Sequence, residues 1–261
     1  MIPTPPPQNS TVNAEFFSND GINNNNNLNK NNLFNFEEWQ KIKKENIPTI
    51  LIAPSWGRNA LFSKYGMQLL KPLCETQYNI IIRPHPQTFI SEKELLNQLQ
   101  EQTKIYSNIM WDNSVDNIYA MEESDIIIGD YSGVLFDYLA LFNKPIMTTE
   151  FKFNVVGYDL EDTSRKKPWV GSAIQQMSYI IQPQDFNQIK TIIHQVLTDQ
   201  EKEKQRTELK NTLWQYQNQS GKRSTQILLD IQKNVLENKL GDLLSIHHQL
   251  QNIYHLKGQL Q

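Results

Sequence analysis

Ser124-Asp-Ile-Ile-Ile-Gly-Asp-Tyr-Ser-Gly-Val-Leu-Phe-Asp137 decides the fold, because it joins a fully apolar run to a helical pattern through a short polar turn. A short apolar run bounded by turn residues is typical of a strand that is buried on both faces. The apolar residues that follow the turn recur at helical spacing as far as Phe142, and they predict a helix. A strand, a tight turn and a helix form the repeating unit of a parallel α/β sheet.

Further apolar runs repeat this pattern along the chain, at 49–54, 79–83, 144–148, 178–182 and, more weakly, 108–111. Helical patterns lie between several of these runs, for example at 65–75 and 91–102. Fully apolar strands that alternate with helices indicate a parallel sheet covered by helices on both faces. We therefore expect an α/β fold, with a Rossmann-like parallel sheet flanked by helices.

Composition divides the chain into three parts. Residues 1–32 are rich in proline and asparagine and hold too few apolar groups to form a core, which predicts a disordered arm. Residues 33–235 contain the strand and helix patterns and form the predicted α/β domain. Residues 236–261 form a predicted helical tail whose apolar residues would pack on the domain, form a dimer or touch a membrane, and the sequence leaves these alternatives open.

Charge and composition narrow the class of protein. The formal net charge of −3 does not indicate the basic surface that nucleic-acid binding requires, so we expect no nucleic-acid partner. A single cysteine excludes an intrachain disulfide, and the N-terminus lacks the pattern of a signal peptide. No apolar run reaches the roughly 20 residues that cross a bilayer. We expect a location in the cytoplasm or at the inner face of the plasma membrane, with peripheral membrane contact.

Polar residues follow three of the predicted strands, and ligands of open parallel sheets bind beyond the carboxyl ends of the strands. The turn that starts at Asp130 is the most informative of these strand ends. Ser132 is a preferred helix N-cap, and Gly133 lets a ligand approach the backbone closely. Free N–H groups and the helix dipole favour an anion such as a diphosphate there. The alternative is that Ser132 only caps the helix and Gly133 only eases the turn.

A histidine between two prolines follows the strand at 79–83. Proline fixes the backbone, so His85 is held in a stiff, extended turn. His85 can donate a hydrogen bond to a phosphate oxygen or protonate a leaving group, and Arg83 can pair with phosphate through two N–H groups. The alternative for His85 is a hydrogen bond to a backbone carbonyl that only stiffens the loop.

The first strand ends in Ser55-Trp56-Gly57-Arg58, which we interpret as a nucleotide-binding loop. Gly57 opens the loop, Arg58 supplies positive charge, and Trp56 forms a wall for a base or packs into the core. Asp137 lies one turn into the predicted helix, where it bonds a ribose or a polar loop, or stabilises the helix N-terminus. We expect no metal site, because the histidines of the tail have no cysteine partners nearby.

Three motifs resemble those of the CDP-glycerol glycerophosphotransferase family, which builds teichoic acid and similar polyol-phosphate polymers. They are Ile50-Leu-Ile-Ala-Pro-Ser-Trp56, Ile81-Ile-Arg-Pro-His-Pro86 and the 124–137 stretch, followed by Lys144-Pro-Ile146. The resemblance spans roughly residues 49–235. It implies the C-terminal, donor-binding lobe of a GT-B-type glycosyltransferase fold, which binds a CDP-linked donor without a cofactor or metal.

The resemblance also implies roles for individual residues. His85 and Ser132 would contact the donor diphosphate, the turn from Asp130 to Gly133 would face it, and Asp137 would support the site indirectly. The implied reaction transfers phosphoglycerol from CDP-glycerol or a related CDP-alcohol to the hydroxyl of a polyol-phosphate or glycan acceptor, and releases CMP.

The sequence departs from the family pattern in three places. Gly133 replaces a second serine, and Ser55-Trp56-Gly57-Arg58 stands where the family has Thr-Trp-Arg. The segment before residue 49 is too short to form the family's acceptor lobe. A partner chain would then supply that lobe, or the chain is a truncated gene product, or it binds a nucleotide donor without catalysing transfer. A nucleotide-sugar transferase or epimerase of the GT-B kind is a further alternative.

Overall fold

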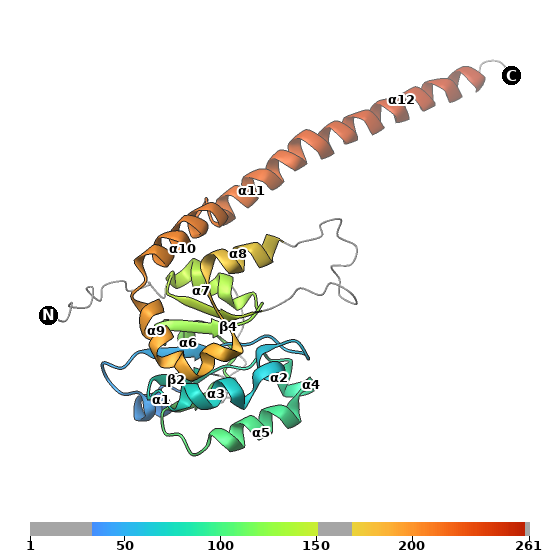
Figure 1. Ribbon diagram of the computed structural model, residues 1–261. Coiled ribbons are helices and arrows are strands. Elements are labelled where there is room, and N and C mark those ends of the chain that lie inside the picture. Colours follow the sequence, from blue (N-terminus) through green and yellow to red (C-terminus); the bar gives the residue numbers. More distant parts are fainter. Residues whose placement is uncertain (1–32, 151–168, 259–261) are drawn as a thin grey trace.

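A parallel β-sheet forms the centre of the protein (Figure 1). The computed structural model describes residues 33–150 and 169–258, so the predicted arm at 1–32 lies outside the described residues. Within the described residues the strands are β1 (Thr49–Ile52), β2 (Asn79–Ile82), β3 (Ile109–Trp111), β4 (Ile126–Gly129), β5 (Ile146–Thr149) and β6 (Tyr179–Ile181). All paired neighbours are parallel, in the order β3-β2-β1-β4-β5-β6. The predicted α/β fold and its parallel sheet are confirmed.

Helices cover both faces of the sheet. One face packs against α2 (Leu61–Tyr65), α3 (Met67–Cys74), α5 (Lys93–Thr103), the 3₁₀ helix η3 (Pro183–Gln188) and α9 (Ile189–Leu197). The other face packs against α1 (Phe36–Ile42), α6 (Ile118–Glu123), α7 (Val134–Phe142), α8 (Trp169–Met177) and α10 (Gln200–Leu213). The short helix α4 (Thr88–Ser91) follows the loop after β2.

The central strand β1 shows why the strands are apolar throughout. Ile50 and Ile52 point into the core on one face, and Leu51 points into the core on the other. All three side chains are fully buried. Successive side chains of a strand alternate between faces, so a strand covered on both sides needs an uninterrupted apolar run.

Gly129 ends β4, where the sheet meets helix α7, and the packing there leaves no room for a side chain. A Cβ at Gly129 would lie 2.9 Å from Leu135 Cδ2 and 3.2 Å from the carbonyl oxygen of Ala53. Leu135 is fully buried, so it has little freedom to move. We expect Gly129→Ala to lower the free energy of unfolding by about 1–3 kcal/mol, the usual cost of overpacking. Urea denaturation measures this change.

Gly133 provides the matched control for this prediction. A Cβ at Gly133 would meet nothing within 4 Å, and serine is a favoured residue at a helix start. Gly133→Ser should therefore leave the free energy of unfolding within about 0.5 kcal/mol of its original value. Equal stability of the Gly129→Ala and Gly133→Ser proteins would contradict the close packing at Gly129.

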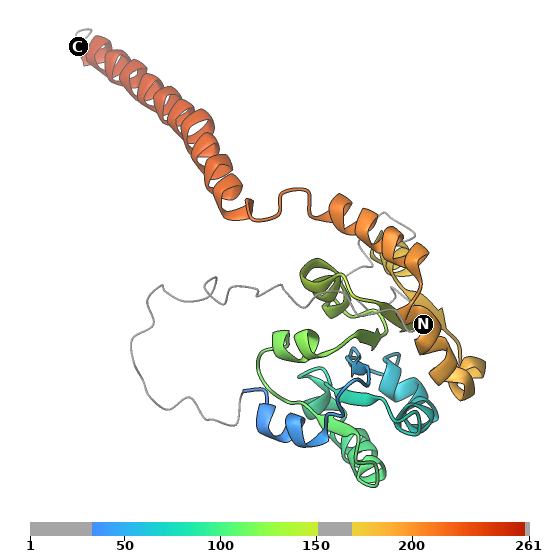
Figure 2. The same ribbon diagram turned by 90° about the vertical axis from the view of Figure 1, so that its left-hand side faces the viewer.

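The C-terminal part of the chain is one long helix that leads away from the α/β domain (Figures 1 and 2). It consists of α11 (Ser220–Ile231), the π-helical segment η4 (Gln232–Glu237) and α12 (Asn238–Gly258). Every residue from Gln215 to Ile253 is exposed. The predicted helical end is confirmed. None of the described helices combines the length and apolarity needed to cross a bilayer.

Candidate functional site

The candidate site lies at the carboxyl edge of the sheet, where the strand order reverses between β1 and β4. Open parallel sheets bind ligands in the crevice at such a reversal point. The loops after β1, β2 and β4 carry all the residues that the sequence analysis selected for binding or catalysis except Asp137, which lies in α7. Because the three strands are neighbours in the sheet, their loops start side by side.

The carboxylate of Asp130 joins the loops after β1 and β4. It accepts hydrogen bonds from the backbone amides of Ser55 (3.0 and 3.1 Å), Leu61 (2.9 Å) and Tyr131 (2.7 Å). Asp130 is 1% exposed, so these bonds form away from water. We expected Asp130 to contact the donor diphosphate, whereas the structure uses its oxygens to fix the course of two loops.

Aromatic contacts bring the loop after β2 to the same place. The rings of Trp56 and His85 lie 6.3 Å apart, centroid to centroid, with their planes inclined by 35°. The Tyr131 hydroxyl donates to the carbonyl oxygen of Trp56 at 3.4 Å. Trp56 itself is 48% exposed, so its ring lies at the surface rather than in the core. Residues from all three loops are thus in contact around Trp56.

The hydrogen bond of His85 fixes its tautomer. Its Nδ1 accepts from the backbone amide of Gln87 at 3.1 Å, so in the neutral ring the proton is on Nε2. Nε2 forms no hydrogen bond with any described residue, and the side chain is only partly buried. The Nε2–H group is therefore available to donate a hydrogen bond to a ligand at this rim.

Ser132 and Gly133 form the turn into helix α7. Gly133 occupies the N-cap position, and the Ser132 hydroxyl oxygen accepts from the amide of Val134 at a long 3.4 Å. The helix thus begins one residue later than expected with Ser132 as the cap. The backbone amides of Ser132 and Gly133 have no acceptor among the described residues, and Gly133 is exposed. Open amides at a helix N-terminus attract anions.

Arg83 faces the loop after β3. Its guanidinium pairs with the carboxylate of Asp112 and donates to the hydroxyl and carbonyl oxygens of Ser114 (2.9 and 2.8 Å) and to the carbonyl of Val115 (3.1 Å). The side chains of Arg83 and Asp112 are 11% and 3% exposed. We expected Arg83 to bind phosphate, but most of its donors are occupied by this loop.

Gly57 and Arg58 form a turn in the loop after β1. Gly57 has a φ of +94°, which a side chain would strain, and its amide donates to Glu92 Oε2 at 3.1 Å. Arg58 is exposed and has no hydrogen bond or ion pair with any residue in the described ranges 33–150 and 169–258. Its charge is therefore available to a ligand at this rim.

Asp137 lies on the exposed side of the first turn of α7. Nearby residues still remove enough water from its carboxyl group to raise its pKa. Asp137 accepts no hydrogen bond from the described residues, so its expected supporting role has no visible contact here. The residues that the structure describes contain no cluster of three or more His, Cys, Asp or Glu side chains that could hold a metal.

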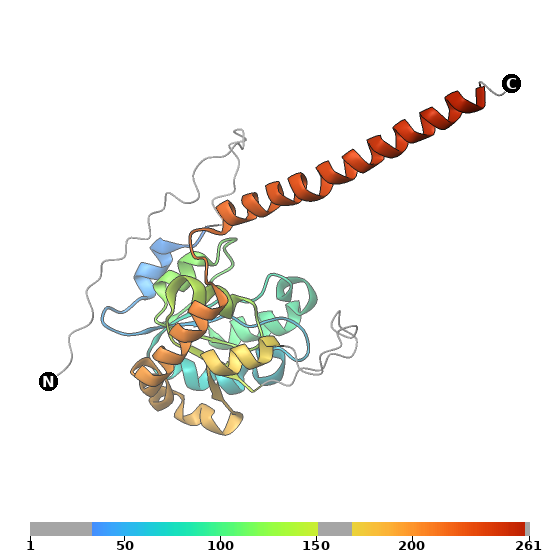
Figure 3. The ribbon, with the colours of Figure 1, turned by 90° about the horizontal axis from the view of Figure 1, so that it is seen from above.

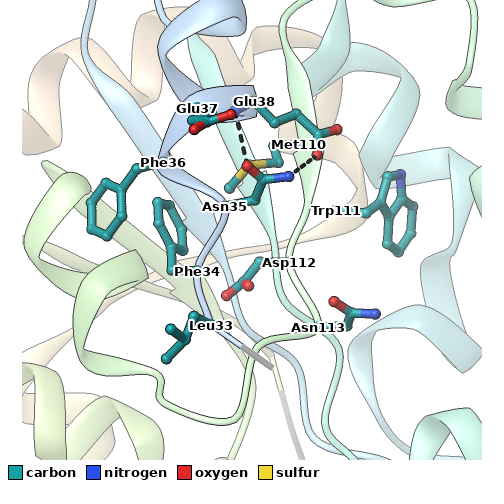
Figure 4. A pocket seen from close by; sticks show the side chains of 10 residues that line it. All are labelled: Leu33, Phe34, Asn35, Phe36, Glu37, Glu38, Met110, Trp111, Asp112 and Asn113. Atoms are coloured by element: carbon teal, nitrogen blue, oxygen red, sulfur yellow. Dashed lines mark hydrogen bonds between the residues drawn. The ribbon is translucent and has the colours of Figure 1, made fainter. Parts of the chain in front are cut away.

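A cavity of about 680 Å³ opens at the end of β3, which the sequence analysis did not select (Figure 4). Residues on both sides of it come from α1 with its preceding turn and from the end of β3: Leu33, Phe34, Asn35, Phe36, Glu37, Glu38, Met110, Trp111, Asp112 and Asn113. Its volume is in the range of small-molecule sites. Asp112 belongs to both the cavity wall and the Arg83 pair. The polar run Asp112-Asn113-Ser114 after a strand was the signal that could have indicated it.

Solved structures with a related arrangement are distant in sequence. A trehalose-phosphate synthase (UDP-forming) from Burkholderia vietnamiensis is 10% identical, with a TM-score of 0.45, and the match covers 74% of this chain and 45% of that one. HepE from Anabaena, in complex with UDP-glucose, is 12% identical, with a TM-score of 0.46 and coverage of 70% and 49%. This chain thus spans about half the length of these proteins. No curated protein sequence matches it significantly.

A family model matches most of the chain. It describes the CDP-glycerol:poly(glycerophosphate) glycerophosphotransferases and matches residues 18–233, which include all six strands and the three loops of the candidate site. The resemblance inferred from the sequence motifs is therefore confirmed. This chain belongs to the CDP-glycerol:poly(glycerophosphate) glycerophosphotransferase family.

Proposed function

We propose that the rim of the sheet binds the diphosphate of a CDP-linked alcohol, with CDP-glycerol as the donor. The observation that carries this proposal is the contact of three loops at the reversal of strand order. From this contact we infer that Nε2 of His85 lies on the same rim as the backbone amides of Ser132 and Gly133, none of which has a hydrogen-bond partner among the described residues. Preorganised N–H donors stabilise phosphate charge without further rearrangement.

The proposed reaction transfers phosphoglycerol to an acceptor hydroxyl. The hydroxyl oxygen forms a bond to the β-phosphorus, and the bond from that phosphorus to the bridging oxygen breaks. CMP leaves with the bonding electrons, and a base takes the proton of the acceptor. We propose that His85 donates to an oxygen of the diphosphate, and that Arg58 and the amides at α7 stabilise the remaining charge.

Asp130 and Arg83 have a different part in this proposal. A buried carboxylate beside a diphosphate would repel it, and the Asp130 oxygens already accept four hydrogen bonds. Arg83 is similarly engaged with Asp112 and Ser114. We propose that both residues hold the loops in place and do not contact the donor.

Donor binding without transfer is a second candidate function. In that case a partner chain would supply the acceptor site. Measuring CMP release from CDP-glycerol in the presence of a polyol-phosphate acceptor, with and without candidate partner proteins, separates the two functions. CMP release only with a partner supports a split enzyme.

Nucleotide titration tests the donor class directly. We expect CDP to bind at least about tenfold more tightly than UDP or GDP, a difference of about 1.4 kcal/mol in binding free energy. Isothermal titration calorimetry measures the three dissociation constants. CMP should bind more weakly than CDP, because it lacks the β-phosphate that the amides and His85 would hold. Equal affinity for CDP and UDP would contradict the choice of a CDP-linked donor.

A further inference from the structure

Helix α12 carries an apolar band that no described residue covers. Its members are each between 48% and 63% exposed: Leu240, Leu243, Ile246, Leu250 and Ile253. Spacings of three and four residues place these side chains on one side of the helix. The opposite side carries polar residues and a glycine: Asn238, Gly241, Ser245, His248, Gln249 and Asn252. Lys239 and His247 lie among the apolar residues, and no described residue covers this side of the helix.

This apolar band lies away from the transferase domain. The helix that carries it points out from the domain in all three views (Figures 1, 2 and 3). Residues 238–258 also lie beyond the segment that matches the family, which ends at 233. The band therefore lies outside the segment that matches the family and outside the loops of the proposed donor site.

The spacing of the band indicates another helix as its partner. Leu236, Leu243 and Leu250 recur every seven residues, and Ile246 and Ile253 repeat the same interval, with Lys239 at the corresponding position one repeat earlier. Leu236 lies in the π-helical segment η4, and the other residues lie in α12. On a straight α-helix a seven-residue repeat drifts by about 20° per repeat, and winding two helices around each other removes this drift. Such apolar heptads are the pattern of left-handed coiled coils.

A membrane surface fits the band less well than a protein does. Helices that lie on membranes carry lysine and arginine on their polar side, where the lipid headgroups are. The polar side of α12 has neither residue between Asn238 and Ile253, and the only charged residues in this range are Lys239 and Asp242. Electrostatic attraction to anionic lipids would be weak.

We propose that two copies of this chain associate through the apolar band of α12 and form a coiled coil. The same band on both copies is self-complementary in a two-fold arrangement, which is the commonest symmetry of soluble oligomers. Covering five half-exposed side chains and Leu236 on each copy would bury on the order of 1,000 Å² in total. That area meets the lower limit for a specific interface. We expect the chain to be dimeric in the micromolar range of concentration, where the experiment below is made.

Sedimentation equilibrium of the full chain tests this proposal. We expect a mass of about twice the 30.5 kDa of one chain. The double variant Leu243→Lys/Leu250→Lys should raise the dimer dissociation constant at least about 100-fold, because two lysines would enter the apolar seam. The matched control Ser245→Lys/Asn252→Lys adds the same charge at the same spacing on the opposite side, and it should remain dimeric.

Three outcomes would overturn the proposal. In the first outcome, the original protein is a monomer at micromolar concentration. A second is a dimer that both double variants preserve or both disrupt. The third is a monomer that co-sediments with phosphatidylglycerol vesicles unless Leu243 and Leu250 are replaced, which would assign the band to a membrane. Because all four positions are exposed, CDP binding should be unchanged in both variants and serves as the check on folding.

Discussion

Replacing Asp130 with alanine is expected to lower the free energy of unfolding by about 3–5 kcal/mol, the largest loss of stability that we predict for a single residue. The change removes the common acceptor of three backbone amides, from Ser55, Leu61 and Tyr131. Each buried amide without an acceptor costs about 1–3 kcal/mol. Urea denaturation, followed by circular dichroism, measures the change in the free energy of unfolding.

Asp130→Asn separates the charge of the side chain from its shape. Asparagine keeps one oxygen acceptor but places an NH₂ group where a carboxylate oxygen accepts amide protons now. The free energy of unfolding of Asp130→Asn should therefore lie between that of the original protein and that of Asp130→Ala. We expect CDP affinity to fall in the same order, from the original protein to Asp130→Asn to Asp130→Ala, because the hydrogen bonds of Asp130 position the loops after β1 and β4.

Asp137→Ala is the control for Asp130. It removes a carboxylate from the same strand–helix unit, but this side chain is exposed and accepts no hydrogen bond from the residues described. Its pKa is raised in the folded protein, so its ionised form gives no stability at neutral pH that the variant could lose. We expect a change within about 0.5 kcal/mol. Similar losses of stability in Asp137→Ala and Asp130→Ala would contradict the role of Asp130 in joining the loops after β1 and β4.

The strands could be predicted from the sequence because their burial is visible in it. A short, β-branched apolar run such as Ile126-Ile-Ile128 favours a strand covered on both faces, and all six runs became strands of the sheet. Short helices are harder to predict: α2, α4 and α6 were missed, as was the nine-residue α8. Helix α6 has six residues, which is less than two full turns of the helical pattern.

The roles of charged residues at the rim could not be predicted from their position in the chain. Arg83 and Asp130 stand at strand ends, which suggested ligand contacts for both. Their partners come from other segments, 29 residues away for Asp112 and 75 for Ser55. Such a partner depends on which strands become neighbours, and one sequence does not specify that order. A charge at a strand end therefore indicates the location of a site more reliably than a contact with its ligand.

His85 remains the residue whose replacement should affect donor binding most. We expect His85→Ala to raise the dissociation constant of CDP by about 10- to 150-fold, since a hydrogen bond to a charged group contributes about 1.5–3 kcal/mol. Among the described residues the partly buried ring has one hydrogen bond, which it accepts from the amide of Gln87, so the protein should stay folded. Calorimetric titration with CDP measures the effect.

Two comparisons distinguish loss of the proposed phosphate contact from a general loss of structure. CMP, which lacks the β-phosphate, should lose less affinity than CDP in His85→Ala. His194→Ala removes an exposed histidine of α9 and should bind CDP as the original protein does. An unchanged CDP affinity in His85→Ala, or equal losses for CMP and CDP, would exclude His85 as a donor to the diphosphate. The open amides at the start of α7 would then have to hold the diphosphate without it, and Gly133 rather than His85 would be the residue to vary next.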